Sequence, residues 1–417
     1  MSRLRPEASN AFWKQTSAVD QTRSDSSPTG MLDPFPPPPT WLRDRVEPWA
    51  LYFNLPTLSD HIHEVLIALA GYQFIHSVLS PWLSAILFPR HYPHLNKRTK
   101  LNWDVHVVSL VQSTLVNTLA LWIMFADKER KSMDINERIY GYTGTCGFLE
   151  ALAAGYFVYD LIISTIHIKL FGVGMLFHAI SALWVFSFGF RPFVNFYSPT
   201  FILYELSSPF LNIHWFLDKL NLTGSNLQWY NGMLLLSVFF SCRLVWGTWQ
   251  SVLVYRDMWH ALSQSWTLSS LSTAADVNVA IFGNRKLMAQ NCVDEACLRA
   301  NEEVFKYAGF SAGGVPTWLV GTYVAANVVL NSLNYYWFSK MVETVLKRFR
   351  GPKEGEKKIG GEKVEEVVED IAQKVVLEAA ATLEEEEGRV FLGDVPVEQG
   401  VVAGDVDVGG EVRRRRG

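Results

Sequence analysis

The stretch GYTGTCGFLEALAAGYFVYDLIISTIHIKLFGVGMLFHAISALWVFSFGF, residues 141–190, decides the fold. It holds two apolar runs, 142–165 and 170–188, each about as long as the ~20 residues that a helix needs to cross a bilayer. Three ionisable side chains lie inside these runs: Glu150, Asp160 and His178. Such a side chain at bilayer depth costs on the order of a few kcal/mol, so it usually faces the interior of a helix bundle and marks a site or pathway. The stretch therefore predicts a membrane protein with a polar interior.

The composition of the whole chain predicts an all-α polytopic membrane protein. Of its 417 residues, 49% are hydrophobic and 19% charged, and the charged residues are denser at both ends than in residues 60–345. The net charge of −4 comes mostly from an acidic C-terminal tail. We find no phosphate-binding glycine loop, nucleophile elbow or zinc signature. We therefore expect no metal, no cofactor and no nucleic-acid partner.

Hydropathy predicts about seven transmembrane helices, one of them broken or re-entrant. The continuous spans are expected at residues 62–88, 103–126, 142–165, 170–188, 229–255 and 315–338. The segment 192–220 is interrupted by Pro199 and Pro209, so we expect a broken helix that lines a protein-enclosed cavity. Four parts result: a disordered Pro/Ser-rich segment (1–59), a first span with a basic link (60–96), a membrane domain (97–347) with an inserted loop (257–313), and a charged tail (348–417) with an amphipathic helix at about 362–387.

Basic residues orient the chain. Lys340, Lys347, Arg348, Arg350 and Lys353 follow the last span, and positively charged flanks stay in the cytosol, so the C-terminus is predicted to be cytosolic and the N-terminus lumenal. No cleavable signal peptide is expected, because no apolar core follows the first basic residues. The sequon at Asn221 would then face the cytosol and stay unmodified. The tail helix is expected to bind a protein partner or a second copy of the chain.

Two cysteines in a loop are candidates for a disulfide, and four histidines near the ends of spans are candidates for metal ligands. Cys292 and Cys297 lie in one loop, where a lumenal disulfide and two free thiols both stay open. Two pairs of histidines lie near span ends: His61 with His63, and His91 with His94. Their spacing suits a metal, but no third ligand follows at a sensible offset. We interpret them as histidines at the membrane interface.

Four motifs in this order resemble a known family, the TLC-domain membrane proteins. They are KRTKLNWDVHVVSLVQS (97–113), GYFVYDLI (155–162), MLFHAISAL (175–183) and YELSSPFLNIHWFLDKL (204–220). The last motif is similar to the TLC-domain-containing branch, of fungal type, more than to true ceramide synthases. The resemblance implies a multi-pass endoplasmic-reticulum protein that acts on or senses lipids, with a helical barrel around a cavity.

The resemblance also marks where this chain departs from ceramide synthases. Those enzymes carry two adjacent histidines and later a pair of aspartates. Here His178 is followed by Ala179, and Glu205 and Ser208 stand where the aspartates would fall. We therefore expect a lipid-binding protein that acts in sphingolipid or acyl-lipid homeostasis, and keep two alternatives: an acyltransferase with acyl-CoA as co-substrate, and a trafficking or translocation-associated receptor that acts through its tail.

Two candidate site residues, His178 and Asp160, each have two possible roles, one in catalysis and one in helix packing. As the base of an N-acylation, His178 would take a proton from an amine, with Asp160 or Glu205 orienting the ring. As a packing residue, His178 would bond a neighbouring helix, and Asp160 would pair with Arg243 at bilayer depth. Glu205 is expected to face the cavity. The remaining residues of the expected lipid cavity are Arg243, Ser208 and Asn212.

Overall fold

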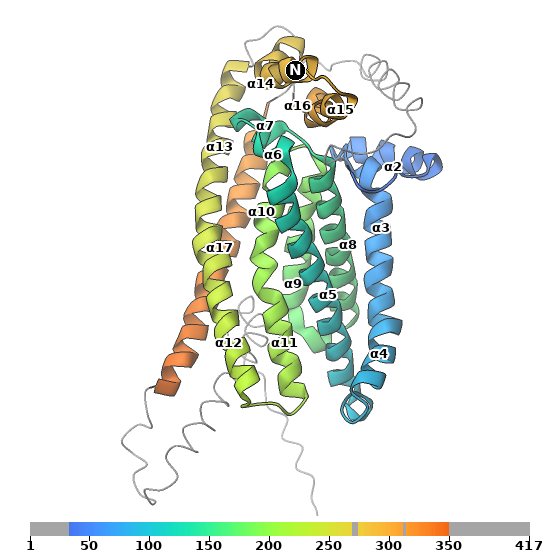
Figure 1. Cartoon of the computed structure of the whole chain (residues 1–417), viewed down its shortest axis with the longest axis vertical. Coiled ribbons are helices and arrows are strands. Elements are labelled where there is room, and N and C mark those ends of the chain that lie inside the picture. Colours follow the sequence, from blue (N-terminus) through green and yellow to red (C-terminus); the bar gives the residue numbers. More distant parts are fainter. Residues whose placement is uncertain (1–32, 269–273, 312–313, 350–417) are drawn as a thin grey trace, which may run out of the picture.

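The computed structural model describes residues 33–268, 274–311 and 314–349, and within these ranges every regular element is helical. The long helices run roughly along one axis, and short helices cover one end of them (Figure 1). Residues 1–32 of the predicted N-terminal segment and the predicted tail helix at about 362–387 lie outside the described residues.

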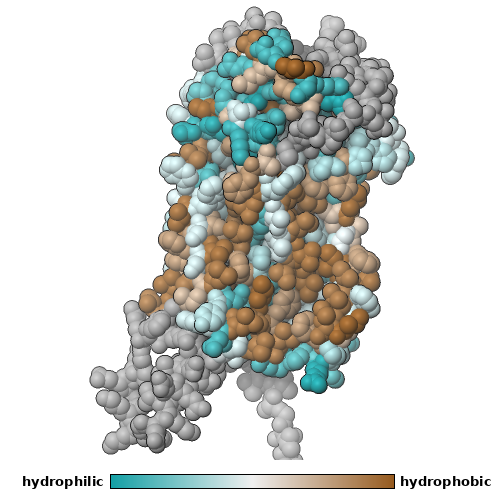
Figure 2. Space-filling view, viewed as in Figure 1, coloured by the Kyte–Doolittle hydropathy of each residue, from teal (hydrophilic) through white to brown (hydrophobic). Residues whose placement is uncertain are grey.

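Four helical segments are long and apolar enough to cross a membrane: Leu58–Leu87, Lys97–Ala126, Ile135–Ile166 and Asn226–Trp266. Their elements are α3 (Leu58–Phe74), η1 (Ile75–Leu79), α4 (Ser80–Leu87), α5 (Lys97–Ala126), α7 (Ile135–Tyr140), α8 (Gly144–Ile166), α12 (Asn226–Phe239), η6 (Phe240–Trp246) and α13 (Gly247–Leu268). Figure 2 shows hydrophobic side chains gathered over the middle of the visible face and hydrophilic ones concentrated at its upper end. The all-helical membrane class predicted from hydropathy is confirmed.

α8, from the stretch quoted first, lies at the centre of the bundle. Its segment is the most enclosed of the four, with 67% of its apolar window buried, and it packs against α3, α5 and α9 (Ile168–Ser187). Small side chains bring α3 close: a Cβ on Gly155 would lie 2.6 Å from the Cβ of Ala68 and 2.8 Å from the carbonyl oxygen of Val65. Small residues at a crossing are a common means of tight helix packing within a bilayer.

The chain after α8 is irregular, as its glycines and prolines predict. Gly172 in α9 has a φ of +80°, which glycine adopts readily. Pro199 and Pro209 occupy the first turns of two short helices, where the missing N–H costs no helical hydrogen bond. The predicted break at 192–220 is observed as a series of pieces: η4 (Asn195–Tyr197), α10 (Ser198–Ile202), η5 (Leu203–Ser207) and α11 (Ser208–Lys219), with η3 (Phe188–Phe190) just before them.

Short helices form a cap over the end at which α8 begins (Figure 1). The cap consists of α2 (Thr40–Tyr52), α6 (Lys128–Lys131), α7, α14 (Ala274–Gln290), α15 (Glu295–Val304) and α16 (Ala308–Ser311). A disulfide joins Cys292 and Cys297 between α14 and α15, so of the two states left open by the sequence the bonded one is observed. From the cap, α17 (Thr317–Phe349) returns along the bundle to the opposite end (Figure 1).

Two predicted boundaries are wrong. Part of the segment 1–59, predicted to be disordered, forms α2, which packs on α3 and buries Ala50. The predicted loop 257–313 is largely helical: α13 continues to Leu268, and α14, α15 and α16 follow. Asp257, expected to begin that loop, is fully buried and its Oδ2 lies 2.6 Å from Nε of Arg138. Asp257 therefore does not mark the end of a span but forms an internal ion pair with Arg138.

Candidate functional site

Arg243 on the π-helical turn η6 organises the polar interior. Its Nη2 lies 3.8 Å from Oε1 of Glu205 on η5, its Nε donates to Ser207 Oγ at 3.1 Å, and its Nη1 donates to Asn334 Oδ1 of α17 at 3.2 Å. Ser208 bridges the two charged side chains: its hydroxyl donates to Glu205 Oε2 at 2.5 Å and lies 3.5 Å from Nη2 of Arg243. The arrangement holds a charge pair inside the helix bundle with hydrogen bonds from three parts of the chain.

Asn212 extends this cluster toward α5. Its amide nitrogen donates to the carbonyl oxygen of Ser208 and to Ser109 Oγ, each at 3.0 Å. Its Oδ1 lies 2.7 Å from Nδ1 of His106, so in this geometry Nδ1 carries the proton. The His106 ring stacks on Trp215 with centroids 4.1 Å apart. We call the connected set the polar network: His106, Ser109, Glu205, Ser207, Ser208, Asn212, Arg243 and Asn334.

Asp160 is buried on α8, the helix that packs against α5 and α9. The carboxylate at ion-pair distance from Arg243 is Glu205. Arg243 on η6 therefore pairs with a carboxylate of the broken segment, where the sequence suggested Asp160.

The structure brings together four of the predicted site residues, Glu205, Ser208, Asn212 and Arg243. The backbone of His178 belongs to α9, which packs against α8, but its side chain lies outside the described part of the chain. The expected roles of His178 as base and of Asp160 and Glu205 as its orienting groups stay predictions.

An apolar groove of about 330 Å³ borders the polar network. Its walls come from η5 and from α12 with η6, and consist of Leu203, Leu206, Ser237, Val238, Ser241, Cys242 and Trp246. The two serines add little polarity, because their hydroxyls donate to carbonyl oxygens four residues earlier in their own helix. Leu206 and Cys242 adjoin Ser207 and Arg243 in sequence, so neighbouring residues of η5 and η6 line the groove and belong to the network.

Sequence reasoning missed several members of the network. Ser207 adjoins a predicted residue, and His106 and Ser109 lie in a quoted motif, but neither helix periodicity nor charge distinguishes them from packing residues. Asn334 belongs to a span rich in asparagine and tyrosine. An asparagine in an apolar span needs a hydrogen-bond partner, and this signal marks Asn334 as interior without naming the partner.

Comparison with known proteins decides the family, because the model of the TLC domain matches residues 102–343. The chain belongs to the TLC domain family. This confirms the resemblance that the four motifs indicated. All members of the polar network, from His106 to Asn334, lie within the matched residues.

Relatives occur in fungi and animals. An uncharacterised TLC domain-containing protein of Schizosaccharomyces pombe is 35% identical over 316 residues, which cover 76% of this chain and 89% of that protein. Topoisomerase I damage affected protein 4 of Saccharomyces cerevisiae is 32% identical over 231 residues, or 54% of this chain and 79% of that protein. TLC domain-containing protein 4 of Homo sapiens is 29% identical over 181 residues, or 43% and 67%.

Proposed function

We propose that this TLC domain protein binds a membrane lipid in the groove beside Arg243 and acts in sphingolipid or acyl-lipid homeostasis. The observation that carries the proposal is that neighbouring residues of η5 and η6 line an apolar groove of about 330 Å³ and form a network that holds both a guanidinium and a carboxylate. A lipid has the same division: an acyl chain fits the apolar walls, and an amide, hydroxyl or charged head group fits the network. The volume lies at the lower end of the range for ligand sites, so the groove takes part of one chain.

The proposal includes a membrane arrangement. α9, the pieces α10 to α11, and α17 would cross the bilayer beside the four apolar segments, which gives seven passes and a broken fifth one. The end opposite the cap would be cytosolic, as the basic residues of the α4–α5 link favour: Arg90, Lys97, Arg98 and Lys100. The cap with its disulfide would then face the oxidising lumen of the endoplasmic reticulum.

The test is lipid retention by the purified full-length protein. Leu206→Trp fills the groove, whereas Val245→Trp introduces the same side chain on η6 at a position that is 56% exposed and outside the lining. We expect native mass spectrometry and lipid extraction to show loss of the co-purifying lipid in Leu206→Trp and its retention in Val245→Trp. Arg243→Gln should keep the chain in place but change which head groups are retained. Equal lipid content in all variants would refute the proposal.

The two alternatives make separate predictions. An acyltransferase with His178 as base requires that His178→Ala fail to restore acyl-lipid species in cells lacking the protein, at equal protein level, with acyl-CoA as co-substrate. A receptor that acts through its tail requires that deletion of residues 354–417 abolish function while His178→Ala does not. Lipid binding without catalysis predicts rescue by His178→Ala and failure of Leu206→Trp.

A further inference from the structure

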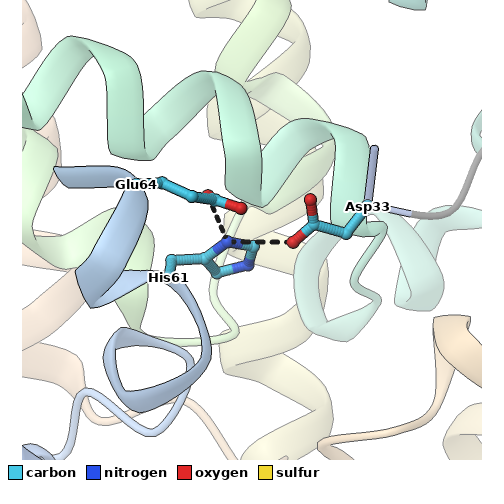
Figure 3. Close-up of side chains that lie close together, drawn as sticks. All are labelled: Asp33, His61 and Glu64. Carbon is cyan, nitrogen blue, oxygen red and sulfur yellow. Dashed lines mark hydrogen bonds and ion pairs between the residues drawn. The ribbon is translucent and has the colours of Figure 1, made fainter. Parts of the chain in front are cut away.

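A second polar cluster lies at the start of α3, away from the polar network. His61 and Glu64 lie in the first turns of α3, three residues apart, and Asp33 comes from the segment before α2 (Figure 3). Nδ1 of His61 lies 2.7 Å from Glu64 Oε2 and 3.4 Å from Asp33 Oδ2. One donor atom from each residue falls within 4.8 Å of the others. Two segments far apart in sequence thus present one nitrogen and two oxygens to a common point.

The cluster has an unsatisfied buried acceptor. Glu64 is 1% exposed, and its Oε1 has no hydrogen-bond partner among the described residues. Figure 3 shows this second oxygen on the side toward Asp33. A buried carboxylate oxygen without a donor or cation is costly, because burial removes the water that would solvate it. Two facing carboxylates add mutual repulsion, which a cation between them would remove.

Neighbouring cationic side chains are already engaged elsewhere. Lys306 Nζ lies 2.9 Å from Asp60 Oδ2, and Arg43 Nη2 lies 3.4 Å from Asp60 Oδ1. The hydroxyl of Tyr307 donates to the same carboxylate at 2.5 Å. Lys306 and Arg43 therefore both pair with Asp60. Within the part of the chain that the structure describes, Asp33 and Glu64 have no lysine or arginine at ion-pair distance.

A contact at Nε2 fixes the imidazole of His61 in the orientation that a metal ligand needs. Its Nε2 contacts the hydroxyl of Tyr142, and a hydrogen bond at the distal nitrogen is the usual device that fixes a ligating histidine. Gly147 of α8 allows this position, because a Cβ there would clash with Nε2 of His61 and lie 2.7 Å from the Tyr142 hydroxyl. The ring is fully buried, with Nδ1 directed at the two carboxylates.

We propose that Asp33, His61 and Glu64 bind one Zn²⁺ ion, which fastens the segment before α2 to the start of α3. Imidazole nitrogen and carboxylate oxygen are zinc ligands, and three protein ligands leave a fourth position for water. The two carboxylates balance the charge of the ion. The ion would take Nδ1 and the Glu64 carboxylate as ligands in place of the hydrogen bond between Nδ1 and Oε2, so metal binding and that hydrogen bond exclude one another.

The experiment measures Zn²⁺ binding by the full-length protein, purified without an affinity tag that binds metal. Metal-free protein is titrated with Zn²⁺, and elemental analysis after desalting gives the stoichiometry. Asp33→Asn removes a ligand from outside the helical bundle, so the bundle still folds, and Glu64→Gln removes one from α3 with its shape conserved. Asp44→Asn changes an exposed acid of α2 and serves as the control.

We expect about one Zn²⁺ per chain in the wild type and in Asp44→Asn, and at least a roughly tenfold weaker affinity in both ligand variants. Co²⁺ bound in place of Zn²⁺ should give the visible absorption of a four-coordinate site, which Asp33→Asn should lose. Zn²⁺ should also raise the melting midpoint of the wild type but not of Asp33→Asn. Substoichiometric zinc in the wild type, or equal affinity in Asp33→Asn and Asp44→Asn, would overturn the proposal and leave His61 as the donor of an ordinary hydrogen bond.

Discussion

The prediction that best tests the packing of the cap concerns Arg285 of α14, which is 2% exposed. Its Nε donates to Glu137 Oε1 at 2.9 Å and its Nη2 to Oε2 at 2.6 Å, across 148 residues of sequence. Its Nη1 donates to Ser132 and to Asn301 of α15. This one side chain therefore joins α14, α15 and α7, and Glu137 itself is 3% exposed. We expect Arg285→Met to loosen the packing of the cap.

The magnitude follows from burial. Removing one partner of a buried, hydrogen-bonded ion pair costs about 3–5 kcal/mol, because the other charge stays buried and unpaired. The control is Arg299→Met, which removes a partner of the exposed pair with Glu295 on α15 and should cost ~0.3–0.5 kcal/mol. At about 2 °C per kcal/mol, the lower end for a large chain, the melting midpoint should fall by roughly 6–10 °C in Arg285→Met and by about 1 °C or less in Arg299→Met.

Scanning fluorimetry of the purified full-length protein in one detergent measures both midpoints. Combining Arg285→Met with Glu137→Gln should recover much of the loss, because the remaining group is then neutral, and glutamine still suits the capping box that Glu137 forms with Asp134. Equal midpoints for Arg285→Met and Arg299→Met would refute the reasoning, as would a double variant less stable than Arg285→Met alone.

Two further predictions test the bundle and its orientation. Gly155→Ala should destabilise the protein by about 1–3 kcal/mol through overpacking of α8 on α3. The control is Gly71→Ala on α3, where the added Cβ meets nothing within 4 Å; it should stabilise the protein by up to about 1 kcal/mol through helix propensity. Urea or thermal unfolding that ranks the two variants the other way would contradict the close approach of α8 and α3. A glycosidase-sensitive mass shift should be absent at Asn221, at the end opposite the cap, and present when Val293→Thr creates a sequon at Asn291 in the cap; the reverse pattern would place the cap in the cytosol.

Much of the fold could be predicted from the sequence, because membrane helices are set by local composition. The apolar runs around Asp160 and His178 became α8 and α9, and Pro199 and Pro209 marked the broken segment. The cap could not be predicted in this way. α2 follows a proline run and has no apolar stripe long enough to cross a membrane, and its folding depends on packing against α3, which is a contact between segments.

The candidate site shows the same division between local and long-range information. A charged or amide side chain within an apolar span is unusual enough to mark Glu205, Asn212 and Arg243 as interior residues. Which groups pair is decided by how the helices are rotated and shifted, so the sequence suggested Asp160 for Arg243 while the structure has Glu205. The start of α3 shows the limit most clearly: Glu64, three residues after His61, shares a cluster with it, and Asp33 joins them from a segment that was predicted to be disordered.

The backbone at Arg243 explains why the polar network and the groove occur together. η6 is a π-helical turn and η5 a 3₁₀ turn, and the two are in contact. Each departs from the α-helical hydrogen-bond pattern, and π-turns are rare and concentrate at functional sites. Such a departure persists only where other interactions compensate for it, and here the guanidinium of Arg243 bonds to Ser207 on η5 and to Asn334 on α17. Within this turn Arg243 belongs to the network and the adjacent Cys242 lines the groove, so the irregular backbone lies where the polar and the apolar residues meet.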